Sequence, residues 1–561
     1  MPFSLLKRSE KKDYPHTTEK HSEANTPDSH SLRHPNGQTD TAEVQHEDNV
    51  AAEREEKPKV TIIAVSLGVI ASMGGMVFGY ESGQISGFLN GFDYQQRFGE
   101  DMVFSAARSG TLVGLLPIGA LIGCLSSGYI ADKIGRKHTI SFASLIYIIG
   151  VIIEISSTTH WVQFAMGRLV TGLGVGALST AVPMFQTESC PKNIRSMVVA
   201  SYQLMITIGI LMAYLINFGT EKNYDNSAQW RITVGISSLW AIILGVGIQA
   251  MPESPRYVYR KGDIVKARQT FARLAGVDIN HSIVNEEINE IEIKAQEERN
   301  APKASFTEIF TGPGMLHRTL LGMALQAGQQ LTGANFFFYY STTIFKATGL
   351  TNGYVTSIIL GAVNVISTIF GIWIVKRVNR RTALIAGGLW MFVCFMIFAF
   401  VGQFQLPSPD PDTSKQAGTV MIVFTCFFIF AFATTWGPMV WSQVAELYPI
   451  KHRAVCLALA TACNWLFNFL ISFFTTFITD AINYYYGLVF AGCCLGMSVI
   501  VFFFMIETKG LSLEEVDDMY ASGVPAIGSA NFDYAAWKQS IRNDRAQTGV
   551  LSPKTETSAE V

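Results

Sequence analysis

A single acidic residue interrupts the first long apolar segment of the chain. Glu81 is the only charged residue between Val60 and Phe92, and an ionised side chain at the centre of a membrane helix costs about 2.5–3.5 kcal/mol. Arg168, in the fourth apolar segment, is the matching cation. A carboxylate beside a buried guanidinium can exchange a proton, because the cation sets how readily the proton binds. The two residues could equally form a fixed structural ion pair.

A second group of candidate residues consists of uncharged amides and indoles inside apolar segments. Gln326, Gln329 and Gln330 share one face of an expected helix. Carboxamides both donate and accept hydrogen bonds, which suits the hydroxyl groups of a neutral polyol, although a lone Gln in a membrane usually joins two helices. A pocket of amides and indoles therefore fits an uncharged, hydroxylated ligand better than an ion. The other members are Gln203, Asn217, Asn335, Asn364, Asn464, Asn468, Trp436, Trp441 and Trp465.

Charged motifs mark the ends of the apolar segments. Gly128-x-x-x-Asp132-x-x-Gly135-Arg136-Lys137 follows the second segment. A signal for membrane orientation explains its basic residues but not Asp132. The pattern predicts a latch of charges between neighbouring helices, which breaks and re-forms during movement. The residues expected in this latch are Asp132, Arg136, Lys137, Glu188, Arg195, Glu253, Arg256, Glu446 and Arg453.

The composition indicates what holds these residues in place. The 561 residues are 49% hydrophobic and 15% charged, with a mean hydropathy of +0.27. Of the 86 charged residues, 52 lie in residues 1–59, 256–318 and 511–561. The remainder is too apolar for a soluble enzyme or a disordered protein. A net charge of −2 gives no attraction to nucleic acid. The sequence has no Walker A, nucleophile or metal motif, so we expect neither an enzyme nor a bound cofactor.

Twelve segments are long enough to cross a bilayer as helices. An all-α membrane protein with twelve transmembrane helices follows. Between the sixth and seventh segments, 263–274 and 283–299 alternate charged and aliphatic residues at helical spacing, which predicts amphipathic helices. The twelve segments are 62–87, 108–131, 138–156, 161–185, 197–219, 231–250, 318–343, 353–376, 383–402, 418–444, 453–478 and 483–505.

The chain also repeats itself. Glu188-x-x-Pro191-x-x-x-Arg195 recurs as Glu446-x-x-Pro449-x-x-x-Arg453 at the same helix boundary, which predicts two pseudo-symmetric six-helix halves in the same orientation. The excess of Lys and Arg in alternate short loops places both termini in the cytoplasm. The expected parts are a disordered cytoplasmic tail (1–59), a first bundle (60–255), a cytoplasmic helical linker (256–317), a second bundle (318–510) and a cytoplasmic tail (511–561).

Taken together, the motifs between residues 60 and 510 resemble those of the sugar porter family of the major facilitator superfamily, and the long polar tails resemble fungal hexose transporters. The matching residues include Gly74 to Gly83, Gly167-Arg168, Pro252 to Arg256, Gln329-Gln330, Gly437-Pro438-x-x-Trp441, Asn464-Trp465-x-x-Asn468 and Glu507 to Gly510.

The resemblance implies a plasma-membrane transporter of a hexose, such as glucose, that works by alternating access. We favour proton symport through Glu81 and Arg168, which the resemblance does not decide, because family members of both kinds keep the acid–Arg pair. A facilitated-diffusion uniporter and a transporter-like sugar sensor remain alternatives. The implied partners are the hexose, protons and the lipid bilayer, with no nucleic acid. The sugar site that it implies consists of Gln203, Gln329, Gln330, Asn335, Asn364, Trp441 and Asn468.

Several positions depart from the family pattern, among them Phe185 in place of a Tyr, Ser196 in place of a Gly and Ile506 in place of a Pro. Glu81 stands in place of the usual Asp, which adds one methylene but keeps the charge. In the second half, Lys376 replaces an acid and Asn379 replaces a Gly. The latch of the second half is therefore expected to be weaker, or built differently.

Overall fold

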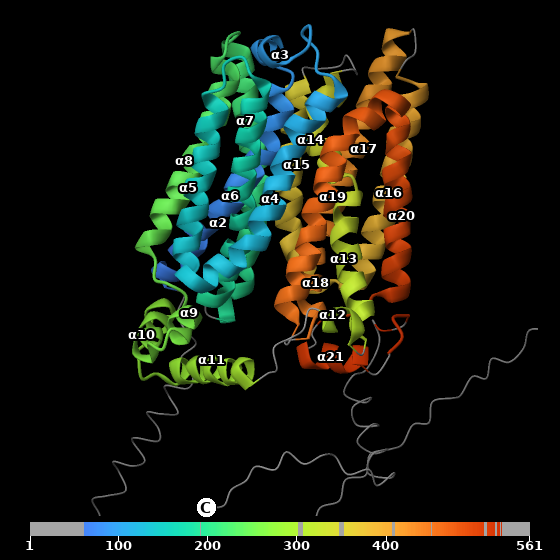
Figure 1. Cartoon of the computed structure of the whole chain (residues 1–561). Helices are drawn as coiled ribbons and strands as arrows, with labels where there is room; N and C mark the ends of the chain where they lie inside the picture. Colours follow the sequence, from blue (N-terminus) through green and yellow to red (C-terminus); the bar gives the residue numbers. More distant parts are fainter. Residues whose placement is uncertain are drawn as a thin grey trace, which may run out of the picture. The chain divides into compact units, whose positions relative to one another are not determined.

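The first six expected segments are helices in the computed structural model of the chain (Figure 1). They are α2 (Ile62–Phe88), α4 (Ala106–Ile134), α5 (Arg136–Ile155), α6 (Trp161–Ser189), α7 (Lys192–Asn223) and α8 (Ala228–Gly247), with the short helix α3 (Phe92–Phe98) after α2. The structure describes residues 61–190, 192–300, 307–312, 314–346, 353–406, 410–449, 452–509, 513–521, 524–527 and 529. The expected N-terminal tail, 1–59, lies outside these residues.

The other six segments form the second half, in which two of the spans are broken. The seventh is divided into α13 (Met315–Leu331) and α14 (Ala334–Lys346), and the tenth into α17 (Pro411–Thr434) and α18 (Trp436–Leu447). The unbroken spans are α15 (Gly353–Arg377), α16 (Arg380–Phe404), α19 (Arg453–Ile482) and α20 (Tyr486–Phe504).

Hydropathy alone recovers eleven of the twelve spans. Ten ranges among the described residues are long and apolar enough to cross a membrane, and one of them, Val455–Phe504, contains two expected segments. The seventh segment is missed because α13 has 17 residues and α14 has 13. The expected all-α fold with twelve membrane helices is confirmed.

Each broken helix has a local cause. Gly333, between α13 and α14, has a φ of +85°, which an L-residue with a side chain rarely adopts. Added at this position, a Cβ would also lie 2.7 Å from the Phe490 ring. The tenth span breaks at Thr435, where φ is −125° and ψ is −80°, just before Trp436-Gly437-Pro438. Such breaks free backbone carbonyls, which membrane proteins place only where they are buried or line a cavity.

Rows of glycine bring neighbouring helices into close contact. On α2, glycines recur every fourth residue and face α7. A Cβ on Gly79 would overlap the carbonyl oxygen of Ile206, and one on Gly83 would lie 2.9 Å from the carbonyl oxygen of Ile210. Gly119 of α4 and Gly172 of α6 face each other in the same way. Small residues of this kind let membrane helices pack tightly without a hydrophobic driving force.

The two halves meet along three pairs of helices: α4 with α19, α7 with α15, and α2 with α14. Hydrogen bonds join the halves, and three of them lie near one end of the bundle. The hydroxyls of Tyr214, Tyr354 and Thr476 donate to the carbonyls of Phe338, Gly87 and Ala106. All three lie toward the end of the bundle where α2, α7 and α19 finish and α4 and α15 begin. The path between the halves is therefore closed at this end.

Short helices gather at the opposite end of the bundle (Figure 1). The linker contains α9 (Pro255–Arg260), α10 (Ile264–Ala275), α11 (Ser282–Asn300) and α12 (Glu308–Thr311), and α21 (Leu513–Ala521) follows the last span. Both expected amphipathic helices are present, as α10 and α11. Their apolar faces form a small separate core that includes Phe271, Val284 and Ile288, so the linker has its own packing.

Candidate functional site

Glu81 and Arg168 form an ion pair inside the first half. The Arg168 Nη1 donates to the Glu81 Oε1, and the two side chains are 2% and 0% exposed. The Glu81 Oε2 accepts a second hydrogen bond, of 2.7 Å, from the Tyr147 hydroxyl. The Arg168 Nε donates to the Leu112 carbonyl at 3.3 Å. A buried pair is stable only when such additional bonds satisfy it, and removing one partner from a buried pair costs about 3–5 kcal/mol.

Aromatic rings pack together near the end of α2. Tyr94 of α3 contacts Phe88 and Phe164, with ring centroids 5.0 and 5.3 Å apart, and also packs on Trp230. The Trp230 indole nitrogen donates to Asp93 at 3.0 Å. The short helix α3 is thereby fixed against α2, α6 and α8.

The predicted amides of the seventh span meet at the break between α13 and α14. The Gln330 Nε2 donates to the Asn464 Oδ1 at 2.9 Å, and the Gln330 Oε1 accepts from the Asn335 Nδ2 at 2.5 Å. Gln330 and Asn335 are half-buried. Asn464, on α19, also donates to the Gln326 Oε1 at 2.8 Å and to the Gln329 Oε1 at 2.9 Å. Asn464 is therefore the centre of the amide cluster formed by these five residues.

Gln329 connects the two broken helices. Its Nε2 donates to the carbonyl oxygens of Trp436 at 2.9 Å and Gly437 at 2.8 Å. These carbonyls belong to the first turn of α18, immediately after the break in the tenth span. The side chain is 5% exposed, so in this conformation Gln329 holds the backbone of α18 in place.

The remaining predicted sugar residues are Asn468, Gln203, Asn364 and Trp441, and they lie on α19, α7, α15 and α18. Asn468, one turn after Asn464 on α19, accepts a hydrogen bond of 3.2 Å from the Tyr339 hydroxyl of α14. Gln203 and Asn364 lie on α7 and α15, which pack against each other across the two halves. Trp441, on α18, is 38% exposed. The structure thus joins Gln330 directly to Asn335 and, through Asn464, to Gln329. No hydrogen bond that it describes links the other four residues to these three.

The latch of the first half has a buried centre. The Arg136 side chain, 3% exposed, pairs with Glu188 at 2.9 Å and with Asp132 at 3.0 Å. Ser254 donates to Glu188 at 2.6 Å. The Glu253 carboxylate accepts from the backbone nitrogens of Arg136 and Lys137, both at 3.2 Å, where the start of α5 offers free N–H groups.

The second half repeats this arrangement. Arg380 pairs with Glu446, and Thr508 donates to Glu446 at 3.0 Å. Glu507 accepts from the backbone nitrogens of Arg380 at 3.1 Å and Arg381 at 2.9 Å, at the start of α16. The second latch is thus built from the equivalent residues in spite of the Gly-to-Asn change. The side chain of Lys376 lies outside the described residues, so the effect of that substitution stays a prediction.

The other predicted latch residues join different partners. Arg195 pairs at 3.2 Å with Glu287 of the linker helix α11, and its Nε donates to the Cys190 carbonyl. Arg453 is the first residue of α19, and it interacts electrostatically with Glu446 and Arg256. Arg195 therefore ties the linker to the start of α7, which sequence reasoning did not foresee.

Residues 67–520 match the family model described as sugar (and other) transporter. The chain belongs to this sugar transporter family. It is 44% identical over 472 residues to the low-affinity glucose transporter HXT3 of Saccharomyces cerevisiae, covering 83% of each chain. It is 43% identical over 471 residues to the high-affinity fructose transporter ght6 of Schizosaccharomyces pombe, covering 82% of this chain and 88% of that one. Both relatives are named as transporters, not as enzymes.

The same fold occurs in solved structures of a bacterial sugar transporter. The xylose transporter XylE from E. coli, in a partially occluded inward-open conformation, matches with a TM-score of 0.68 and 23% identity. A structure of the proton:xylose symporter XylE bound to 6-bromo-6-deoxy-D-glucose matches with a TM-score of 0.69 and 24% identity. The two matches cover 81% and 82% of this chain and the whole of those chains. This chain therefore shares its fold with XylE, which is described as a major facilitator superfamily protein.

Three residues at these sites are not among the predicted sugar, proton-coupling or latch residues. Asn464 is one of the candidate amides and lies in a motif that carries the resemblance, but the predicted sugar site does not include it. Glu287 belongs to a charged linker segment, in which no pattern distinguishes it from its neighbours. Glu154 is the third, and it is completely buried on α5. A charge inside a segment that spans the membrane is itself a signal of function, and it could have been found in this way.

The exposure of the latch residues predicts which substitutions impair transport most. We expect Glu188→Gln to slow transport strongly, because it leaves the buried Arg136 with a weakened partner. Asp132→Asn should have a smaller effect, since the Asp132 side chain is 61% exposed and water screens its two ion pairs. Sugar binding should survive in both variants. Uptake normalised to surface abundance measures the two transport defects. Equal defects, or a larger defect in Asp132→Asn, would contradict the interpretation that the buried pair of Arg136 and Glu188 is the centre of the latch.

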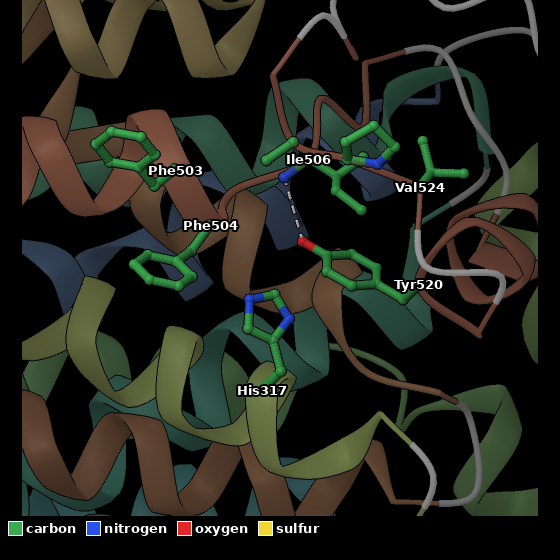
Figure 2. Close-up of a pocket in the computed structure, with 8 residues that line it drawn as sticks. His317, Phe503, Phe504, Ile506, Tyr520 and Val524 are labelled. Atoms are coloured by element: carbon green, nitrogen blue, oxygen red, sulfur yellow. Dashed lines mark hydrogen bonds between the residues drawn. The ribbon is translucent and has the colours of Figure 1, made fainter.

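A separate cavity of about 260 Å³ lies at the end of α13 and α20 that faces α21 (Figure 2). The Tyr520 hydroxyl accepts a hydrogen bond from the Ile506 backbone nitrogen at 3.4 Å, and the His317 ring lies beside those of Tyr520 and Phe504. Burial raises the pKa of Tyr520 to about 12, so this hydroxyl stays neutral. Gln326 is nine positions after His317 on α13, about 13.5 Å along the helix, which places the cavity away from the amide cluster.

Proposed function

We propose that this member of the sugar transporter family carries a hexose, such as glucose, across the plasma membrane. The observation that carries the proposal is the amide cluster of Gln326, Gln329, Gln330, Asn335 and Asn464 at the broken helices. Each hydrogen-bond partner described above for these side chains is an amide or a backbone carbonyl, and none is charged. Such groups can exchange their mutual hydrogen bonds for bonds to sugar hydroxyls at little net cost.

The names of the relatives support this substrate class. They are described as transporters of glucose and of fructose. Both sugars are uncharged and present several hydroxyls, so one neutral, hydrogen-bonding pocket suits either. A pocket for an anion or a cation would need a charged group to offset the loss of hydration.

Alternating access fits the placement of the contacts between the halves. With both termini in the cytoplasm, the three hydrogen bonds between the halves lie on the outer side, and the two latches lie on the inner side. Rocking of one half against the other would break the outer contacts and expose the amide cluster to the outside. The conformation described here is then closed outward.

Proton coupling is the finer part of the proposal. The ion pair between Glu81 and Arg168 is buried in the outer half of the first bundle, where protonation of the carboxylate would release the guanidinium. The proposed role of Glu81 is to take up a proton from outside and to give it up inside as the halves rearrange. A fixed ion pair in a facilitator is the competing interpretation.

Uptake of a labelled hexose in cells without hexose transporters tests both parts. We expect uptake that increases as the external pH falls and that a protonophore reduces. Absence of uptake, with the protein at the cell surface, would refute transport and favour a sugar sensor. Uptake that ignores pH and protonophore would keep transport but identify a facilitator.

A further inference from the structure

A second acidic residue lies buried beside the ion pair. Glu154 is one residue from the end of α5 and is 0% exposed. Its stem packs against Gly167, where a Cβ would lie 2.5 Å from the Glu154 Cγ. Because Gly167 directly precedes Arg168, the carboxyl lies within one helical turn of the residue that pairs with Glu81. Glu154 interacts electrostatically with both members of the pair.

The hydrogen bonds around Glu154 fit the protonated acid. Its Oε1 is 2.9 Å from the Thr171 hydroxyl oxygen, which is also 3.0 Å and 3.2 Å from the carbonyl oxygens of Arg168 and Gly167. A hydroxyl has a single proton to donate. If Glu154 donates to Thr171, then Thr171 is free to donate to the backbone. The Glu154 Oε2 has no hydrogen-bond partner among the described residues, which a buried carboxylate would tolerate poorly.

Charged and titratable groups face Glu154 from several helices. The Tyr147 hydroxyl lies two turns earlier on the same face of α5 and donates to Glu81. Tyr94 of α3 has a buried hydroxyl without a partner in the described part of the chain and interacts electrostatically with Glu154 and Arg168. From α8, Arg231 donates to the Ser157 carbonyl at 2.9 Å, just beyond the end of α5. One buried guanidinium, that of Arg168, is thus bonded to the Glu81 carboxylate and interacts electrostatically with the buried Glu154 carboxyl.

We propose that Glu154 is a second proton-carrying residue of the coupling site. It holds the proton while Glu81 is paired with Arg168, and it becomes the partner of Arg168 once that proton has moved to Glu81. In this step the O–H bond of Glu154 breaks, an O–H bond of Glu81 forms, and the Arg168 hydrogen bonds move from one carboxylate to the other. The net charge of the three groups stays zero, which avoids the cost of an unpaired buried guanidinium.

The depths of the two carboxyls give the exchange a direction. Glu154 is one residue from the outer end of α5, whereas Glu81 is seven residues, about 10 Å, from the outer end of α2. Glu154 is thus placed to receive a proton from outside. Glu81 lies deeper and is placed to release the proton inward. This inference rests on the proposed proton coupling.

The test is the pH dependence of hexose uptake in Glu154→Gln. Glutamine keeps the size and can donate to Thr171, but it can neither carry the proton nor pair with Arg168 as an anion. Protonating Glu81 then leaves Arg168 without a counter-charge, so uptake should need a more acidic medium. We expect the pH of half-maximal uptake to fall by about 1–3 pH units, with sugar exchange at equal concentrations retained. Glu154→Asp, which keeps the carboxyl, should restore the wild-type midpoint.

Controls separate this inference from the proposed function. Asp101→Asn makes the same chemical change at an exposed position of the outer loop and should leave the midpoint unchanged. If Glu154→Gln does not reach the cell surface, Glu154→Met, which is apolar and of similar length, should give the same shift. Wild-type uptake without pH dependence would overturn proton coupling itself. A pH-dependent wild type and an unchanged midpoint in a neutral Glu154 variant would overturn only the role of Glu154.

Discussion

Glu81→Gln is expected to abolish the accumulation of sugar against a gradient while sugar binding and exchange persist. Glutamine imitates the protonated acid permanently, so the charge-assisted bond to Arg168 is lost and position 81 can no longer take up a proton and release it inward. Uptake should also lose its dependence on external pH. Arg168 is not left unpaired in this variant, because Glu154 is available as a counter-ion, and the protein should therefore reach the membrane.

Two measurements make this expectation specific. Accumulation of a non-metabolised hexose analogue, with and without a protonophore, reports coupling, and exchange of labelled for unlabelled sugar reports binding and movement. Glu81→Asp is the matched control, since it keeps the charge and shortens the side chain by one methylene; we expect it to remain active. If Glu81→Gln accumulates sugar as the wild type does, the pair between Glu81 and Arg168 is only structural.

Much of the fold could be predicted because the bilayer imposes it. Each spanning segment must be a long apolar helix, and the repeated motifs around Glu188 and Glu446 mark equivalent positions in the two halves. The breaks at Gly333 and Thr435 were not predicted. A hydropathy profile averages over many residues and does not locate a break inside a segment. The positive φ of Gly333 is known only from the structure.

The sequence predicted which residue types form the site better than it predicted their hydrogen-bond partners. The pairing of Glu81 with Arg168 followed from their depth, because two lone charges in an apolar interior must meet. The amide cluster could not be derived, since any of several amides could have bonded to Gln330. Its partners are set by how α13 and α19 cross. Glu154 was not predicted because it lies outside the family motifs and near the end of its apolar segment, and its burial depends on the close approach of α5 to Gly167.

Gln329 and Gln330 are adjacent in sequence, yet their side chains have different surroundings in the structure. Gln329 is buried and bonded to the backbone of α18. Gln330 is half-buried and bonded to other amide side chains, Asn335 and Asn464, which can turn toward a ligand. Substitution of Gln329 should therefore reduce the amount of folded protein at the surface, whereas substitution of Gln330 should weaken sugar binding.

Gln330→Ala is expected to raise the KM for hexose, because one or more hydroxyls of the bound sugar lose their hydrogen-bond partner. The cost of leaving such a group unpaired is about 1–3 kcal/mol, or about 5-fold to 150-fold in affinity. Uptake kinetics at matched surface abundance measure this, with Gln330→Asn as the control that keeps the amide at a shorter reach. A KM within about twofold of the wild type, well below that range, would remove Gln330 from the sugar site. Because the amide cluster would then bind no ligand, its hydrogen bonds would serve only to hold α13 and α19 together across the break at Gly333.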